Sequence, residues 1–219
     1  MKGGCPLEGH ALKITSSVNS NVSIEAVPGH FVTSHSHINY YIDITKIKHR
    51  HRMAKDAAGL LAEPYASTTP VDTIICMDGS EILAAYLAEE LTKEDMMSVN
   101  RNQSIHIVPP EFNSNGQMIF RDNLQHMVHG KNVLLLIASI TTGKTLHRVL
   151  ECVDYYGGKV VGVSSVFSAK ESVDGVGVHA IFTAEDIPNY HTYSHRDCPQ
   201  CKQGVKIDAL VNSYGYSAL

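Results

Sequence analysis

The chain has 219 residues, of which 43% are hydrophobic and 18% charged, and its formal net charge is -4 with histidine neutral. This composition is typical of a soluble globular domain that can bury a sizeable core. The mild negative charge argues against a nucleic-acid or membrane surface as the main partner. No apolar run approaches the ~20 residues of a membrane span, and the N-terminus lacks an apolar leader, so we expect a cytoplasmic protein.

The first half of the chain is expected to alternate strands and helices. Residues 11–14 and 22–27 suit an edge hairpin or a helix, and residues 31–32 and 40–42 suit strands around a Ser/His-rich turn. A helical pattern over 53–61 is predicted to end at Pro64. A buried strand over 71–76, a turn and a helix over 82–91 follow.

The second half predicts one complete βαβ unit. Residues 93–125, which hold Pro109-Pro110 and the breakers at 113–116, are expected to form a long loop or β-excursion. An apolar run over 133–137, a helical pattern over 146–153, Gly157-Gly158 and a second run over 160–163 then predict strand, helix and strand. A late strand is expected over 180–183. We predict one α/β domain over 1–219, with a mainly parallel central sheet flanked by helices.

The turn inside this βαβ unit is the strongest functional signal. A turn at the N-terminus of a helix offers unpaired backbone N–H groups to a phosphate. The candidate phosphate-binding residues are Ser139, Thr141, Thr142, Gly143, Lys144 and Thr145. A nucleotide-hydrolysing P-loop is the less favoured interpretation, because Ala138 stands where that motif needs its first glycine.

Several segments taken together resemble the type I phosphoribosyltransferases, and among them the orotate phosphoribosyltransferase family. Thr141-Thr142-Gly143 matches the ribose-phosphate loop of that family. The other matching segments are 29–43 (hood), 71–91 (strand, pyrophosphate turn and helix), 157–167 (next strand) and 198–204 (C-x-x-C-x-x-G tail). The resemblance covers about residues 28–205 in the same order. It implies a small hood formed by about residues 1–50 and 185–219, a homodimer, and Mg²⁺-dependent transfer from phosphoribosyl pyrophosphate (PRPP) to a nucleobase.

Three parts of the family's catalytic apparatus differ in this sequence. Ile137 and Ala138 replace the acidic pair that binds the ribose hydroxyls, and neither side chain accepts a hydrogen bond. The pyrophosphate turn carries Asp78 and Glu81, which repel an anion unless a cation lies between them. The segment from 94 to 130 has no lysine, which leaves Arg101 as the better-placed cation beside Arg121.

We therefore expect a divergent member that binds a phosphorylated ribose or nucleotide, with transfer from PRPP lost or altered. The alternative is an active phosphoribosyltransferase in which Asp78 and Glu81 hold Mg²⁺, with Arg101 as a further catalytic candidate. In the hood-like segment, His35, His37 and Tyr40 are expected either to contact a ligand or to form a solvated turn.

The tail carries a third candidate site. His191, His195, Cys198 and Cys201 have ligand types that suit tetrahedral Zn²⁺, and Cys5 or His10 could join them. The other interpretation is a structural turn with free thiols. An odd number of cysteines, five, in a chain expected to be cytoplasmic favours thiols or metal ligands over disulfides.

Overall fold

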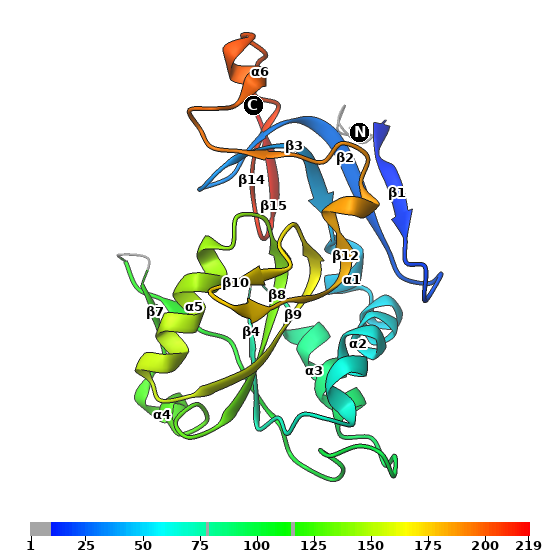
Figure 1. Ribbon diagram of the computed structural model, residues 1–219, viewed down its shortest axis with the longest axis vertical. Coiled ribbons are helices and arrows are strands. Elements are labelled where there is room, and N and C mark those ends of the chain that lie inside the picture. Colours follow the sequence, from blue (N-terminus) through cyan, green and yellow to red (C-terminus); the bar gives the residue numbers. More distant parts are fainter. Residues whose placement is uncertain (1–9, 78, 115–116) are drawn as a thin grey trace, which may run out of the picture.

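The computed structural model describes residues 10–77, 79–114 and 117–219. Its body is a five-stranded sheet in the order β12-β9-β8-β4-β5, and every neighbouring pair is parallel. These strands are β4 (Thr73–Cys76), β5 (His106–Val108), β8 (Asn132–Ile140), β9 (Lys159–Ser168) and β12 (His179–Thr183). The predicted α/β class with a mainly parallel central sheet is confirmed (Figure 1).

Helices cover both faces of this sheet. The helices α2 (His51–Ala66) and α3 (Glu81–Leu91) lie on one face, and α5 (Lys144–Tyr155) lies on the other (Figure 1). Alternate residues of β8 divide between two hydrophobic clusters, with Leu134 and Leu136 packed with α2 and α3 and Leu135 packed with α5. This double burial explains why the sequence of β8 is a continuous apolar run rather than an alternating one.

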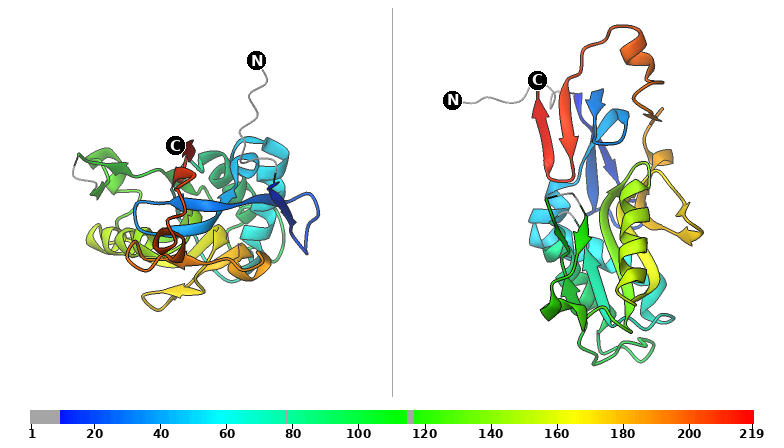
Figure 2. Two further views of the ribbon diagram at one scale, coloured as in Figure 1. Left: turned by 90° about the horizontal axis from the view of Figure 1, so that it is seen from above. Right: turned by 90° about the vertical axis from the view of Figure 1, so that its left-hand side faces the viewer.

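A second sheet forms a hood above the carboxyl ends of the body strands (Figures 1 and 2). Its order is β13-β3-β2-β14-β15, with β1 paired to β2. Its strands are β1 (Leu12–Thr15), β2 (Ser23–Val32), β3 (His37–Asp43), β13 (Thr192–Tyr193), β14 (Ala209–Asn212) and β15 (Gly215–Ala218). Phe31, Tyr41 and Val211 belong to its own small core, so segments from both ends of the chain stabilise one structure.

The remaining elements are short. The hairpins β6 (Glu111–Phe112) with β7 (Met118–Ile119) and β10 (Ser172–Val173) with β11 (Val176–Gly177) extend from the body. The short helices are α1 (Thr45–His49), α4 (Asp122–Gln125), α6 (Pro199–Lys202) and the 3-10 turn η2 (Ala184–Asp186). The predicted loop over 93–125 therefore also contains β5, whose three residues are too few to show a periodic pattern.

The prediction that α2 ends at Pro64 was wrong, because the helix continues to Ala66. A proline inside a helix removes one backbone donor and leaves the carbonyl four residues earlier without its partner. That carbonyl belongs to Leu60, and it lies 3.2 Å from Nε2 of His179 on β12. A side chain from a neighbouring element thus replaces the missing donor, which no local pattern could show.

Among the described helices, none is long and apolar enough to cross a bilayer.

Candidate functional site

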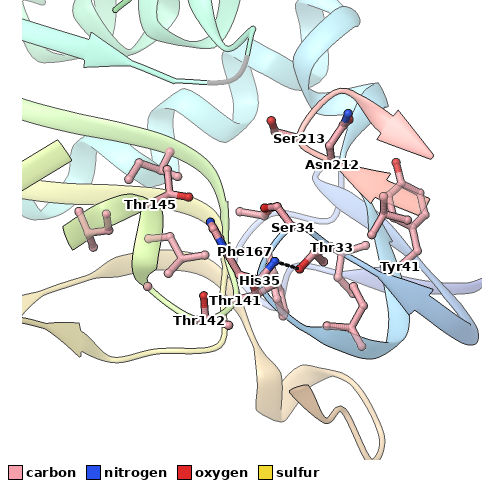
Figure 3. Close-up of a pocket in the computed structure, with 18 residues that line it drawn as sticks. Thr33, Ser34, His35, Tyr41, Thr141, Thr142, Thr145, Phe167, Asn212 and Ser213 are labelled. Atoms are coloured by element: carbon pink, nitrogen blue, oxygen red, sulfur yellow. Dashed lines mark hydrogen bonds between the residues drawn. The ribbon is translucent and has the colours of Figure 1, made fainter. Parts of the chain in front are cut away.

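A pocket of ≈ 170 Å³ lies where the hood meets the carboxyl end of β8. The body side of the pocket is formed by the loop after β8, and the hood side by the β2–β3 turn and the β14–β15 turn (Figure 3). The hood supplies Thr33, Ser34 and His35, whereas Asn212 and Ser213 come from the C-terminal hairpin. Carboxyl ends of parallel strands are where α/β proteins usually bind ligands.

The loop from Ser139 to Thr145 presents hydrogen-bond donors to this pocket. Thr141 and Thr145 line it with hydroxyl groups, and Gly143 is the N-cap of α5 with a φ of 81°. No side chain of the described chain caps the first turn of α5. The backbone N–H groups of that turn and the positive end of the helix dipole are therefore available to an anion.

Two of the predicted phosphate contacts face a second concavity as well. Thr141 and Thr142 separate the first pocket from a neighbouring one of ≈ 410 Å³, which Lys144 and His191 also line. Lys144 is exposed and does not line the first pocket. The loop thus offers hydroxyl and backbone donors on the hood side and an ammonium group on the outer side.

The two residues that replace the acidic pair are buried. Ile137 is 1% and Ala138 0% exposed, and they belong to the hydrophobic clusters on opposite faces of the sheet. Ile137 also lines the pocket, and no carboxylate does so among the described residues. A Mg²⁺ ion prefers carboxylate oxygens as protein ligands, so the described wall of this pocket does not supply its usual ligands.

The structure separates the two catalytic candidates that it describes, Arg101 and Glu81. Arg101 follows Asn100, whose Oδ1 accepts a hydrogen bond from the Val71 N–H at 2.8 Å, two residues before β4 begins. Arg101 therefore lies at the amino edge of the sheet, at the opposite end from the pocket. The prediction that Arg101 is a catalytic residue of this pocket was wrong. Glu81 is exposed at the start of α3, and Asp78 lies outside the described residues.

Arg121, the other arginine of this segment, forms an ion pair outside the pocket. Its Nε donates to Oε2 of Glu111 on β6 at 2.7 Å, and both side chains are exposed. The ion pair joins Arg121, which follows β7, to the first residue of the β6–β7 hairpin. Arg121 thus already has a carboxylate partner in this arrangement.

Of the predicted hood contacts, only His35 lines the pocket. Partial burial, followed by the nearby positive charges of Arg148 and Lys144, lowers the pKa of His35 below its usual value. A neutral imidazole can both donate and accept a hydrogen bond. Tyr40 packs against the main core, whereas Tyr41 is buried in the hood core and also lines the pocket.

The predicted metal residues are separated. Cys198 and Cys201 lie together with His37 and with His30, which sequence reasoning missed. His195 stands outside this group and packs its ring against His37, at 5.0 Å between centroids. His191 faces Tyr193 and the outer concavity instead. His10 is exposed and stands outside this group, and Cys5 falls outside the described residues.

An exposed ion pair fastens the β10–β11 hairpin beside the phosphate-binding loop. Nδ1 of His147 on α5 lies 2.5 Å from Oδ2 of Asp174, and this hydrogen bond raises the pKa of His147 above its usual value. A group whose pKa is raised by folding stabilises the fold fully below its unfolded pKa and loses this contribution as pH rises through the folded pKa. NMR titration should therefore show His147 titrating above about 6.5. In Asp174→Asn its pKa should fall toward that value, and an unchanged pKa contradicts the pairing.

Comparisons with known proteins agree with this architecture. No family model matches the chain. The orotate phosphoribosyltransferase of Desulforamulus reducens is 28% identical over 180 residues, which cover 81% of this chain and 85% of that protein. The enzyme of Pelotomaculum thermopropionicum is 37% identical over 93 residues, 42% of this chain and 46% of that protein.

Two solved structures with similar folds are also phosphoribosyltransferases. Orotate phosphoribosyltransferase of Mycobacterium tuberculosis, solved with Fe(III) dicitrate, has a TM-score of 0.51 at 22% identity and covers 75% of this chain and 92% of its own. Adenine phosphoribosyltransferase of Thermoanaerobacter pseudethanolicus has a TM-score of 0.50 at 14% identity, with coverage of 81% and 97%. The chain therefore has the fold of the type I phosphoribosyltransferases and resembles orotate phosphoribosyltransferases in sequence.

Proposed function

We propose that this protein binds a phosphorylated ribose, free or as part of a nucleotide, with its phosphate on the loop from Thr141 to Thr145. The observation that carries the proposal is a pocket with an uncapped helix N-terminus and three threonines on one side and no carboxylate in its described lining. An uncapped helix N-terminus with hydroxyl donors beside it suits the binding of a phosphate. Transfer from PRPP through Mg²⁺ needs charged ligands that the described pocket lacks.

The size of the pocket favours the sugar phosphate as the recognised part. Its volume of ≈ 170 Å³ lies below the roughly 300–1,000 Å³ that encloses drug-sized ligands. In this arrangement the phosphate lies at the first turn of α5 and the ribose faces the hood. Ile137 then contacts the sugar through an apolar side chain instead of hydrogen-bonding its hydroxyl groups.

A second candidate function is an active phosphoribosyltransferase with Mg²⁺ held by Asp78 and Glu81. Sequence similarity to orotate phosphoribosyltransferases over 81% of the chain favours it. The two candidates differ in what Mg²⁺ does. The binding protein holds ribose 5-phosphate without the ion, whereas the enzyme consumes PRPP and a nucleobase only when the ion is present.

Isothermal titration with ribose 5-phosphate, nucleoside monophosphates and PRPP, each with and without Mg²⁺, tests the proposal. We expect ribose 5-phosphate to bind without Mg²⁺. Thr145→Val removes one hydroxyl and should weaken this binding about tenfold or more, because a hydrogen bond to a charged group contributes about 1.5–3 kcal/mol. Thr15→Val, at an exposed position of β1, is the matched control and should bind as the unchanged protein does.

The proposal fails if none of these ligands binds at millimolar concentration, or if Thr145→Val binds with unchanged affinity. Turnover of PRPP with orotate or another base, abolished by Glu81→Gln, supports the enzyme instead. The resemblance also implies a homodimer. Light scattering tests this implication, because a molar mass near the 24.0 kDa of a single chain contradicts it.

A further inference from the structure

Two histidines and two cysteines converge at the outer end of the hood. His30 on β2, His37 at the start of β3, and Cys198 and Cys201 around α6 each contribute one ligand atom, and all four atoms lie within 4.8 Å of one another. The two cysteines are more than 160 positions away from the histidines along the chain. The fold, and not a local motif, therefore assembles this His₂Cys₂ cluster.

Distances within the cluster agree with the edges of a tetrahedron around a metal ion. With Zn–N bonds of about 2.0–2.1 Å and Zn–S bonds of about 2.3 Å, tetrahedral geometry places nitrogen and sulfur about 3.5 Å apart. Sγ of Cys198 and Sγ of Cys201 each lie 3.5 Å from Nε2 of His30. Sγ of Cys201 lies 3.4 Å from Nδ1 of His37.

The two histidine nitrogens are closer than the tetrahedron requires. Nε2 of His30 and Nδ1 of His37 are 2.9 Å apart, whereas two zinc-bound nitrogens lie about 3.4 Å apart. An outward movement of the two rings by about half an ångström in total reaches that separation. Such a movement is within ordinary side-chain adjustment, so the cluster is close to a coordination geometry.

His30 is oriented as a metal ligand by its other ring nitrogen. Nδ1 of His30 lies 3.0 Å from the Val205 carbonyl oxygen and 3.2 Å from that of Lys206. A carbonyl oxygen only accepts hydrogen bonds, so Nδ1 is the donor, which leaves Nε2 as the ring nitrogen that can bind a metal beside the thiols. Metal-binding histidines usually donate their second ring N–H to a carbonyl or carboxylate in this way.

Burial also separates this cluster from a surface histidine patch. His30 is 1%, His37 6% and Cys198 0% exposed, and Cys201 closes the cluster from the solvent side. Buried polar side chains are costly unless they are paired or coordinate a metal. Four protein ligands leave no position open for substrate, which is typical of a structural zinc site.

We propose that His30, His37, Cys198 and Cys201 bind one Zn²⁺ ion that fastens the C-terminal segment to the hood. Binding replaces the proton of each thiol with the metal and releases both protons to solvent. The ion joins β2, β3 and α6 across the turn that contains Thr33, Ser34 and His35. That turn forms the hood wall of the pocket, so the metal fixes the position of the wall.

Metal analysis of the full chain, produced without a histidine tag and purified under reducing conditions without chelators, tests this directly. We expect about one zinc per chain by inductively coupled plasma mass spectrometry. Replacement of the zinc by Co²⁺ should give the intense visible bands of a tetrahedral thiolate site. Chelator treatment should lower the melting temperature, because a metal that binds only the folded state stabilises it.

Variants locate the ion within the chain. Cys201→Ser changes the most exposed of the four ligands and should lose zinc, with thiolate-to-cobalt bands reduced. Cys152→Ser is the matched cysteine control, and His191→Ala the matched histidine control, because both lie outside the cluster. Both controls should retain about one zinc per chain. Circular dichroism shows whether Cys201→Ser keeps its secondary structure.

Three results overturn the proposal. The first is less than about a tenth of a zinc per chain in the unchanged protein, and the second is unchanged zinc content in a folded Cys201→Ser. The third is a Cys198–Cys201 disulfide, found by mass spectrometry of the alkylated protein, in place of the metal. None of these measurements depends on which ligand the pocket binds.

Discussion

Gly143→Ala is expected to lower the affinity for ribose 5-phosphate by about tenfold or more while the fold is retained. Gly143 lies inside the phosphate-binding loop with a φ of 81°, where a side chain destabilises the backbone by about 1–2 kcal/mol. A methyl group there would also lie 2.7 Å from Cγ2 of Val173 on the β10–β11 hairpin. The loop relieves the backbone strain and the contact with Val173 by shifting, which turns the first backbone N–H groups of α5 away from the pocket. A loss of about 1.4 kcal/mol of binding free energy already lowers the affinity tenfold.

Gly175→Ala is the matched control for a left-handed glycine outside the pocket. Gly175 has a φ of 79°, nearly the same as Gly143, but no atom lies within 4 Å of the position its Cβ would occupy. It therefore carries the backbone penalty without the steric contact, at a place that lines no part of the first pocket. Titration calorimetry should find unchanged affinity in Gly175→Ala. Equal affinity in both variants would show that the geometry of the loop does not position the phosphate.

Local sequence patterns predicted the body of the protein because its elements depend mainly on neighbours along the chain. The apolar run of β8, the Thr-rich turn and the periodic helix α5 follow one another, and β9 returns parallel to β8 after this helical crossover. The turn lies at the carboxyl end of β8 for the same reason. The loop of the candidate site was therefore accessible from sequence.

Features that depend on contacts between segments far apart in the chain could not be predicted from the sequence. The hood joins β14 to β2 in parallel register, with Ala209 opposite Phe31, and no local pattern indicates this pairing. The same pairing brings the C-terminal segment, with its two cysteines, to His30. The sequence does not show this pairing, and it therefore suggested His191 and His195, which are nearer along the chain, as partners of the cysteines. A useful signal was present, because His30 and His37 flank the predicted Ser/His-rich turn and so fall close together in a hairpin.

The misplacement of Arg101 has a similar cause. The sequence showed a long segment with few cations, and the resemblance suggested that its arginine would reach a ligand. The three residues of β5 divide this segment, so that the part before β5 lies at the amino edge of the sheet. The part after β5 starts at the carboxyl edge and returns to the amino edge, where the Met127 carbonyl accepts a hydrogen bond from Thr73 Oγ1 at the start of β4. Arg101 precedes β5 and Arg121 follows it. A single short strand therefore decides that Arg101 lies at the amino edge of the sheet, away from the pocket.

Gly162→Ala is expected to destabilise the protein by about 1–3 kcal/mol, the usual cost of overpacking a core. Gly162 lies on β9 where the register with β8 shifts, opposite Leu134. The aromatic ring of Tyr65, on α2, covers it so closely that a Cβ would lie 2.3 Å from Cε1 of that ring. The ring cannot easily retreat, because the Tyr65 hydroxyl donates to the Val163 carbonyl at 3.1 Å and the side chain is only 8% exposed.

Gly59→Ala is the matched control with the opposite sign. Gly59 lies inside α2, and no atom lies within 4 Å of the position of its Cβ. Alanine there should stabilise the protein by about 0.5–1 kcal/mol, because it reduces the freedom of the unfolded chain and suits a helix. Urea unfolding of both variants measures the two changes. Destabilisation in both, or in neither, contradicts the argument from space at each Cβ.

A double-mutant cycle with Tyr65→Leu tests the steric cause at Gly162. Leucine removes the ring that a Cβ at Gly162 would meet, although it also leaves a cavity and the Val163 carbonyl without its donor. We expect Tyr65→Leu to destabilise the protein alone, and Gly162→Ala to cost much less in its presence than in the unchanged chain. Two residues in contact should show a coupling of about 0.5–3 kcal/mol, whereas additive changes would place the effect of Gly162→Ala in the register shift of β9 rather than in the contact with Tyr65.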